Sequence, residues 1–178
     1  MTSVPRVTPR PRTPIDGRTL RTVCGNFATG VTVITSGSGD DSGGTTVNSF
    51  TSVSLDPPLV LICLHENSRL LPVIRSSGGF VVNLLTRQQE SVAWAFAGRH
   101  TARIDEVPHR RSETGLPVLG DALAHLECRL TTEHDGGDHS ILLGEVVGLR
   151  APDEGQHPLV FFQGSMRGLG DTTAARRS

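Results

Sequence analysis

The chain is poor in the residue types that nucleic-acid-binding proteins use most. It contains no lysine and no tyrosine, has a single tryptophan, and carries a formal net charge of −1 over 178 residues. It therefore lacks both a general attraction for phosphate backbones and a set of rings on which bases could stack. These absences argue against nucleic-acid binding. The use of arginine for all seventeen basic residues indicates a compositional bias of the source.

Cysteine is also scarce. Cys24, Cys63 and Cys128 are odd in number, are widely spaced and form no Cys-x-x-Cys pair. Such a pattern supports neither a disulfide framework nor a zinc site. We expect three reduced thiols, as in the cytosol, and we expect Cys63 to be a small residue of the core.

Long hydrophobic runs are missing as well. No segment reaches the roughly 20 apolar residues that cross a bilayer, and residues 1–16 hold four prolines and three arginines without the apolar stretch of a secretory signal. We expect a soluble, cytoplasmic protein with no membrane partner. We expect one domain at residues 17–170, which is long enough to bury a core without disulfide bonds or a structural metal. Disordered tails at 1–16 and 171–178 would flank it.

Capping signals predict three short helices. Asp16 can cap a first helix that ends at Gly30, Ser68 can cap a second over residues 69–75, and Thr86 with Gln89 can form a capping box for a third. The first helix would have an apolar side made of Leu20, Val23, Cys24 and Phe27. The third helix would run through Trp94 and Phe96.

Strand signals dominate the rest of the chain. The glycine-rich residues 37–44 lead into another strand rather than a helix, so they form a hairpin loop and not a dinucleotide fingerprint. Many antiparallel strands with three short helices predict a mainly β fold, a closed or nearly closed barrel with helical additions. We expect a second subunit to cover its exposed side. The predicted strands are 31–35, 59–64, 80–85, 126–132, 140–149 and 159–162.

One polar segment stands out within this β-structure. Residues 44–55 alternate strand-forming bulk with short hydroxyl and amide side chains, which either line a solvated edge or face a polar ligand. Asp56, Pro57 and Pro58 then interrupt the ladder, and residues 59–64 form an unbroken apolar run typical of a strand buried on both faces. A segment suited to ligand binding is thus predicted beside a core strand.

Several motifs, in order, resemble the flavin reductase family. They are Phe27 to Thr35, Thr46 to Val60, Gly137 to His139, Gly144 to Val146 and Pro158 to Gly164. The resemblance runs from about Leu20 to Leu169, and such ordered agreement is more specific than any single motif. It implies an antiparallel Greek-key split barrel that binds FMN or FAD and uses NADH or NADPH as co-substrate. It also implies a homodimer that supplies reduced flavin to a flavin-dependent oxygenase, which that flavin can reach by diffusion alone.

The resemblance assigns most of the site to two segments. The first would hold the isoalloxazine ring and comprises Thr46, Val47, Asn48, Ser49, Phe50, Thr51 and Ser52. The second would lie near the tail and phosphate of the flavin and comprises Cys63, Leu64, Asn67, Ser68 and Arg69. The alternatives from the residues alone are an Asx or Ser turn in a solvated strand and a plain helix cap beside a solvated arginine. Phe96 and Arg99 complete the predicted set.

His139 is the candidate for catalysis. It matches the histidine of the family's Gly-Asp-His motif, which lies where the nicotinamide stacks, and there it could donate to the carboxamide or stabilise reduced flavin. The alternative is a histidine that only caps a turn. His134, Asp135 and Asp138 lie in the same turn, but their crowding gives poor convergence, so no metal is expected.

Two departures from the family pattern concern cofactor preference. Gln163, Ser165 and Met166 stand where the family carries an arginine, a basic residue and an aromatic. After Gly98 the family's usual acidic, basic and aromatic residues are absent, and Arg99 or Arg103 is the candidate replacement cation. The choices between FMN and FAD, and between NADH and NADPH, stay open.

Two other functions fit the same barrel. One is a non-catalytic flavin or haem carrier, because a fold alone does not fix a function. The other is an oxidase related to the pyridoxamine-phosphate enzymes, for which a denser set of phosphate-binding Arg and Lys would be expected.

Overall fold

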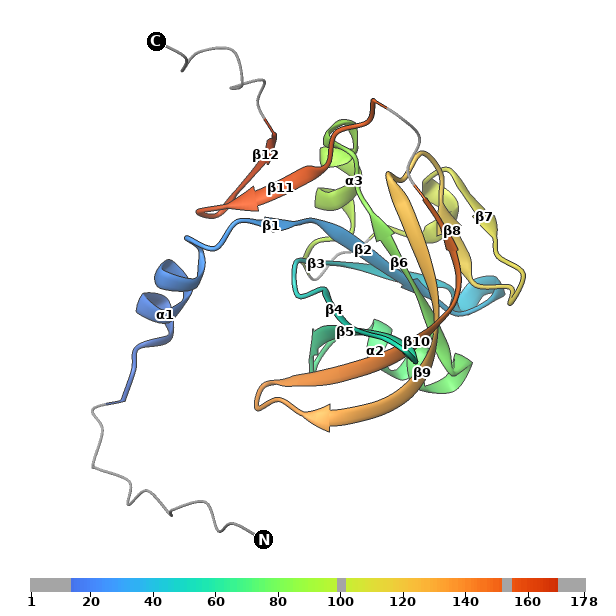
Figure 1. Ribbon diagram of the computed structural model, residues 1–178, viewed down its shortest axis with the longest axis horizontal. Helices are drawn as coiled ribbons and strands as arrows, with labels where there is room; N and C mark the ends of the chain where they lie inside the picture. Colours follow the sequence, from blue (N-terminus) through green and yellow to red (C-terminus); the bar gives the residue numbers. More distant parts are fainter. Residues whose placement is uncertain (1–13, 99–101, 152–154, 170–178) are drawn as a thin grey trace, which may run out of the picture.

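The computed structural model describes residues 14–98, 102–151 and 155–169. Its centre is a strongly curled antiparallel sheet of seven strands in the order β3-β2-β6-β9-β10-β5-β4 (Figure 1). The strands are β2 Thr32–Ser36, β3 Gly43–Val47, β4 Thr51–Leu55, β5 Pro58–His65, β6 Gly79–Leu84, β9 Ala124–Asp135 and β10 His139–Arg150. β3 and β4 follow each other in the chain but lie at opposite ends of this order, so the curled sheet is open between them.

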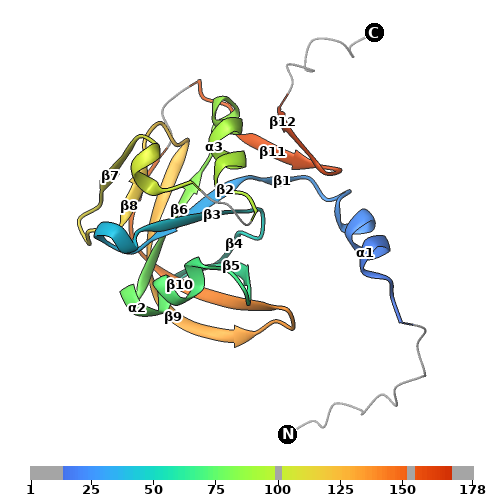
Figure 2. The same cartoon turned by 180° about the vertical axis from the view of Figure 1, so that it is seen from behind.

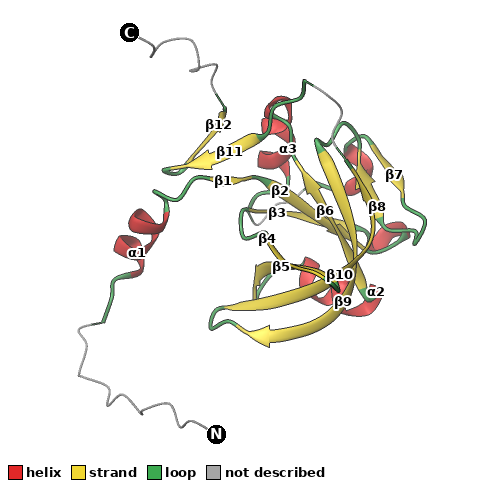
Figure 3. Cartoon of the chain, in the orientation of Figure 1, coloured by secondary structure: helices red, strands yellow, loops and turns green. Residues whose placement is uncertain are grey.

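Short helices and two small sheets surround this sheet (Figure 3). The helices are α1 Gly17–Cys24, α2 Leu70–Ser77 and α3 Glu90–Ala95, with 3-10 turns η1 Gly39–Asp41, η2 Arg87–Gln89 and η3 Ile104–Glu106. β7 His109–Arg111 pairs with β8 Pro117–Leu119, while β1 Thr29–Gly30, β11 Leu159–Phe162 and β12 Ser165–Gly168 form a three-stranded sheet. None of the helices in the described part of the chain is long and apolar enough to cross a membrane.

The core has two main clusters, which lie on opposite faces of β2, because Ile34 belongs to one and its neighbour Val33 to the other. In one, Leu71 and Ile74 of α2 pack with Phe80 and Leu142. In the other, Phe96 after α3 packs with residues of β2 and β11, including Val33 and Leu159. All of these side chains are fully or almost fully buried. Leu71 therefore anchors α2 in the core, and Phe96 anchors the end of α3.

Helix α1 projects away from the sheet (Figures 1 and 2). Asp16 caps it as predicted, since its Oδ2 accepts the Thr19 N–H at 2.9 Å. The helix ends at Cys24, earlier than the predicted Gly30, and the Asn26 side chain caps its end by donating to the Thr22 carbonyl at 2.9 Å. Its apolar side is not covered by the rest of the described residues, and Val23 is 64% and Phe27 76% exposed. This surface therefore requires another partner or faces water.

The other local predictions are largely confirmed. The capping box is present, with the Thr86 N–H donating to Gln89 Oε1 at 3.1 Å, and residues 37–42 connect the β2–β3 hairpin. The second helix begins at Leu70 rather than Arg69. The short strands β7, β8 and β12 were not predicted. Most of the two predicted tails lies outside the described residues.

Two predictions about the central segment need correction. The polar segment is not one strand but two, β3 and β4, with residues 48–50 linking them. The apolar run in β5 is not buried on both faces: Val60, Ile62 and Leu64 are buried, whereas the residues between them are only half-buried. The prediction failed because the sequence of β5 shows that both of its faces are apolar, but it does not show whether the second face is buried.

Candidate functional site

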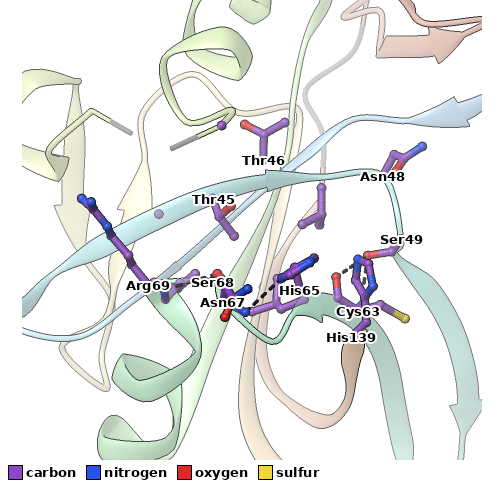
Figure 4. A pocket seen from close by; sticks show the side chains of 15 residues that line it. Thr45, Thr46, Asn48, Ser49, Cys63, His65, Asn67, Ser68, Arg69 and His139 are labelled. Carbon is purple, nitrogen blue, oxygen red and sulfur yellow. Dashed lines mark hydrogen bonds between the residues drawn. The ribbon is translucent and has the colours of Figure 1, made fainter. Parts of the chain in front are cut away.

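A cavity of about 760 Å³ opens where the β3–β4 link, the end of β5, the start of α2 and the start of β10 meet (Figure 4). This volume lies within the range of small-molecule and cofactor sites. Arg69 and Ser68 lie at one end of the cavity, and Asn48, Ser49, Cys63 and His139 lie at the other. Its lining residues are Gly44 to Ser49, Cys63 to His65, Asn67 to Leu70, Gly98 and His139.

The β3 wall of the cavity is fixed by its own hydroxyl groups. Thr46 Oγ1 donates to the Ala93 carbonyl at 2.6 Å, which ties β3 to α3. Ser49 Oγ donates to the Cys63 carbonyl at 2.9 Å and accepts the Cys63 N–H at 3.0 Å. These two hydroxyls therefore hold the wall in place. The Asn48 side chain is exposed and makes no hydrogen bond within the described residues, so its amide can bind a ligand.

The opposite end of the cavity is a tight turn that leads into α2. The Ser68 N–H donates to the His65 carbonyl at 2.7 Å, and Ser68 Oγ accepts the Leu70 N–H at 3.4 Å. Arg69 is exposed and forms no ion pair with any described side chain. An unpaired guanidinium beside the start of a helix is suited to an anionic group.

Two histidines line the cavity. His139 Nδ1 lies 2.7 Å from Asp138 Oδ1, and this hydrogen bond lowers the pKa of the Asp138 carboxyl, with a smaller contribution from His65. His65 Nδ1 accepts the Asn67 N–H at 3.0 Å. Each imidazole thus has one ring nitrogen engaged, and its other nitrogen makes no hydrogen bond to a described residue.

A hydrogen-bonded network of charged side chains joins α2, β9, β10 and the turn after β5. Arg75 of α2 binds Glu133 of β9 through two hydrogen bonds of 3.0 and 2.5 Å, and Ser140 Oγ lies 2.6 Å from Glu133 and 2.8 Å from Glu66. The Arg75 hydrogen bond, followed by that of Ser140, lowers the pKa of Glu133 to about 2. Because Ser140 follows His139 directly, this network fixes the strand that carries the histidine.

The cysteines differ from one another in burial. Cys63 is half-buried and lines the cavity, so the prediction of a core position for it is wrong, whereas Cys128 is buried. Burial raises the pKa of the Cys63 thiol and raises that of Cys128 to about 12, which leaves both thiols protonated at neutral pH. Within the described ranges no group of three or more His, Cys, Asp or Glu could hold a metal ion.

Most of the predicted site residues come together. Ten of them line the cavity: Thr46, Val47, Asn48, Ser49, Cys63, Leu64, Asn67, Ser68, Arg69 and His139. Thr51 and Ser52 are instead exposed on β4, Phe50 packs against the core, and Phe96 is fully buried behind β3. Arg99 lies outside the described residues. The lining also contains residues that were not predicted: Gly44, Thr45, His65, Leu70 and Gly98.

Three of the residues that depart from the family pattern, Gln163, Ser165 and Met166, are not among those that line this cavity. Gln163 has a φ of 49° in the turn between β11 and β12, and its Nε2 donates to Asn26 Oδ1 at 2.8 Å. Met166 packs against the second core cluster. Within one chain, therefore, Gln163 supports the segment after α1 rather than the cavity wall.

The chain is similar to known proteins over most of its length. Residues 24–170 match the family described as "Flavin reductase like domain". HsaB, the reductase subunit of a flavin-dependent monooxygenase from Mycobacterium tuberculosis, is 40% identical over 156 residues, which cover 87% of this chain and 83% of HsaB.

Two solved structures extend this similarity to the fold. BorF, the flavin reductase component of a bacterial two-component tryptophan halogenase, has a TM-score of 0.82 and 41% identity, covering 88% of this chain and 99% of BorF. SgcE6, an NADH:FAD oxidoreductase of Streptomyces globisporus solved with NAD and FAD fragments, has a TM-score of 0.82 and 38% identity, covering 91% of this chain and 99% of SgcE6.

Proposed function

Because this chain belongs to the flavin reductase family, we propose that it reduces free FMN or FAD with NADH or NADPH and supplies the reduced flavin to a partner oxygenase. The observation that carries this proposal is the make-up of the cavity: a polar wall on β3, an unpaired arginine at one end and a histidine with its own carboxylate at the other. The activities after which its relatives HsaB, BorF and SgcE6 are named support the same function.

The cavity fits a flavin on chemical grounds. The Asn48 amide offers donors and an acceptor to the polar edge of the ring, and Ser68 with Arg69 offers a hydroxyl and a cation to a phosphate. The two ends are separated along β3, as the ends of a flavin nucleotide are. Ser49 and Thr46 act indirectly, because their hydroxyls fix the backbone against which the ring would lie.

In this mechanism the chain binds and orients the two substrates. A bound flavin supplies the chemistry, since it can accept a hydride from C4 of the nicotinamide at its N5. His139 would present its Nε2 to the nicotinamide, because Asp138 accepts the hydrogen bond from its Nδ1. Holding the two rings at reacting distance replaces the need for a side-chain nucleophile.

The active unit is a homodimer in this proposal. Leu20, Val23 and Phe27 expose one apolar side of α1, and Leu55 at the sheet edge is 90% exposed. Burial of such surfaces against a second copy would remove them from water, and an obligate interface typically covers about 2,000 Å² or more. The match at 24–170 supports one domain over the predicted 17–170, and the cytoplasmic location stays a prediction.

The test is an assay of nicotinamide oxidation with and without added flavin. The reductase oxidises NADH or NADPH only when FMN or FAD is present, and it transfers electrons to a flavin pool far larger than its own concentration. A chain that binds flavin tightly without oxidising either nicotinamide would instead be a carrier. Oxidation of pyridoxamine phosphate would identify the related oxidase.

A further inference from the structure

His65 has no role in the mechanism above, although it lies in the cavity. It is the last residue of β5 and the direct cross-strand partner of His139 on β10. The two ring centroids are 5.2 Å apart with an interplanar angle of 68°, an edge-to-face contact. Aromatic rings prefer this geometry, and it restricts how each ring can turn.

Hydrogen bonds set the protons of the two rings differently. His65 Nδ1 accepts the Asn67 N–H, so in this geometry Nδ1 carries no proton and Nε2 does. His139 Nδ1 instead donates to the Asp138 carboxylate. The His65 ring is thus oriented by a main-chain group, the Asn67 N–H, whereas the hydrogen bond of the His139 ring goes to a side chain, that of Asp138.

The Asp138 anchor is weak by itself. The Asp138 side chain is 80% exposed and that of His139 is 41% exposed, so water competes with the hydrogen bond between them. Ser140, which follows His139, fixes the backbone of β10 but not the imidazole. Among the described residues, the only ring that contacts the imidazole of His139 is that of His65.

We propose that His65 is a positioning residue for His139, which it holds by their edge-to-face contact in the orientation that serves the nicotinamide. This inference rests on the proposed function. The Asn67 N–H orients His65 by a hydrogen bond, and His65 in turn orients His139 by the ring contact. Loss of His65 should therefore slow hydride transfer and weaken nicotinamide binding without changing the affinity for flavin.

Two substitutions separate this role from a purely structural one. His65→Asn places an amide oxygen near the position of Nδ1, so it keeps an acceptor for Asn67 but removes the ring. His65→Phe keeps the ring contact and removes the acceptor. We expect His65→Asn to lower turnover about threefold to tenfold at an unchanged melting temperature. We expect His65→Phe to lower the melting temperature but to keep turnover closer to that of the unaltered chain.

A double-mutant cycle tests whether His65 acts through His139. His139→Asn alone should lower hydride transfer about tenfold to a thousandfold, as expected for one orienting donor. In that background His65→Asn should change the rate less than twofold. Independent losses in the two single variants, or a larger loss in His65→Phe than in His65→Asn, would overturn the proposal.

A ligand-free measurement supplies a second readout. Long-range ¹H–¹⁵N spectra of the imidazoles should show His65 with its proton on Nε2, and His139 signals that broaden in His65→Asn but not in His65→Phe. Unchanged His139 signals in both variants would contradict the proposal. If the unaltered chain reduced no flavin, the proposed function would fail while these spectra still reported on the contact.

Discussion

One hydroxyl group, that of Ser49, fastens the link between β3 and β4 to the backbone of Cys63. Ser49 Oγ donates to the Cys63 carbonyl at 2.9 Å and accepts the Cys63 N–H at 3.0 Å, so it takes the place of a backbone pair where the curled sheet is open. The cavity wall that carries Asn48 depends on this pair of bonds.

Ser49→Ala should loosen that wall. Two partly buried hydrogen bonds are lost, each worth about 0.5–1.5 kcal/mol, so we expect a lower melting temperature and roughly tenfold weaker flavin binding. Calorimetry and fluorescence titration measure the two effects. Ser54→Ala, on the exposed strand β4 beyond the cavity, is the control and should change neither. Unaltered flavin binding in Ser49→Ala would show that the wall holds without the hydroxyl.

Arg69→Gln should discriminate between flavins. Because the guanidinium is unpaired at the end of the cavity where a phosphate would lie, its loss should weaken FMN and FAD about tenfold and riboflavin, which has no phosphate, hardly at all. Arg129→Gln removes a surface arginine paired with Glu145 and is the matched control. Equal weakening of FMN and riboflavin would place the phosphate elsewhere.

The proposed dimer predicts that one side of α1 is sensitive to charge. Leu20→Asp puts a carboxylate on the apolar side, whereas Thr22→Asp puts one on the opposite side of the same helix. We expect only Leu20→Asp to produce a monomer by light scattering, with turnover and flavin affinity falling together. A fully active species with the mass of one 19.0 kDa chain would rule out the dimer.

The Arg75–Glu133 pair predicts a pH dependence. Its hydrogen bonds lower the pKa of Glu133 to about 2 from a usual value of 4.5, so ionised Glu133 stabilises the fold above about pH 4.5, and this stabilisation is lost as the pH falls toward 2. The pair faces water, so Glu133→Gln should cost only about 0.5–1 kcal/mol of unfolding free energy at pH 7.

Denaturant titrations of Glu133→Gln and of the unaltered chain from pH 7 down to pH 3 measure this effect. The difference between the two chains should shrink with falling pH and with added salt. Glu145→Gln, which breaks a single contact to Arg129, is the control for the loss of a surface carboxylate. If the difference in unfolding free energy did not change with pH, Glu133 would stabilise the fold by its packing rather than by its charge.

Local signals were sufficient for much of the fold. The cap at Asp16 and the capping box of Thr86 with Gln89 form as predicted, because these bonds depend on neighbours within three residues. The hairpin of β9 and β10 also followed from alternation and its turn. The small strand pair β7–β8 was missed, because three-residue strands rich in arginine and proline carry little alternation.

The site was predicted only as far as its motifs reach. Residues 46–49 and 67–69 were expected from a family resemblance and line the cavity. His65 was not expected, because its contact with His139 depends on the register of β5 against β10. The sequence around His65 does not reveal that register. Phe50 and Phe96 were placed in the site by the same family resemblance, yet their large apolar side chains pack in the core clusters.

Anaerobic rapid mixing with an excess of free flavin tests the central claim most directly. NADH or NADPH is added to the purified chain with a flavin pool at least a hundredfold larger than the chain, and the absorbance of oxidised flavin is followed. The account predicts that the whole pool is reduced, with one nicotinamide oxidised per flavin. A chain that binds flavin while neither nicotinamide reduces more than one flavin per chain would contradict it.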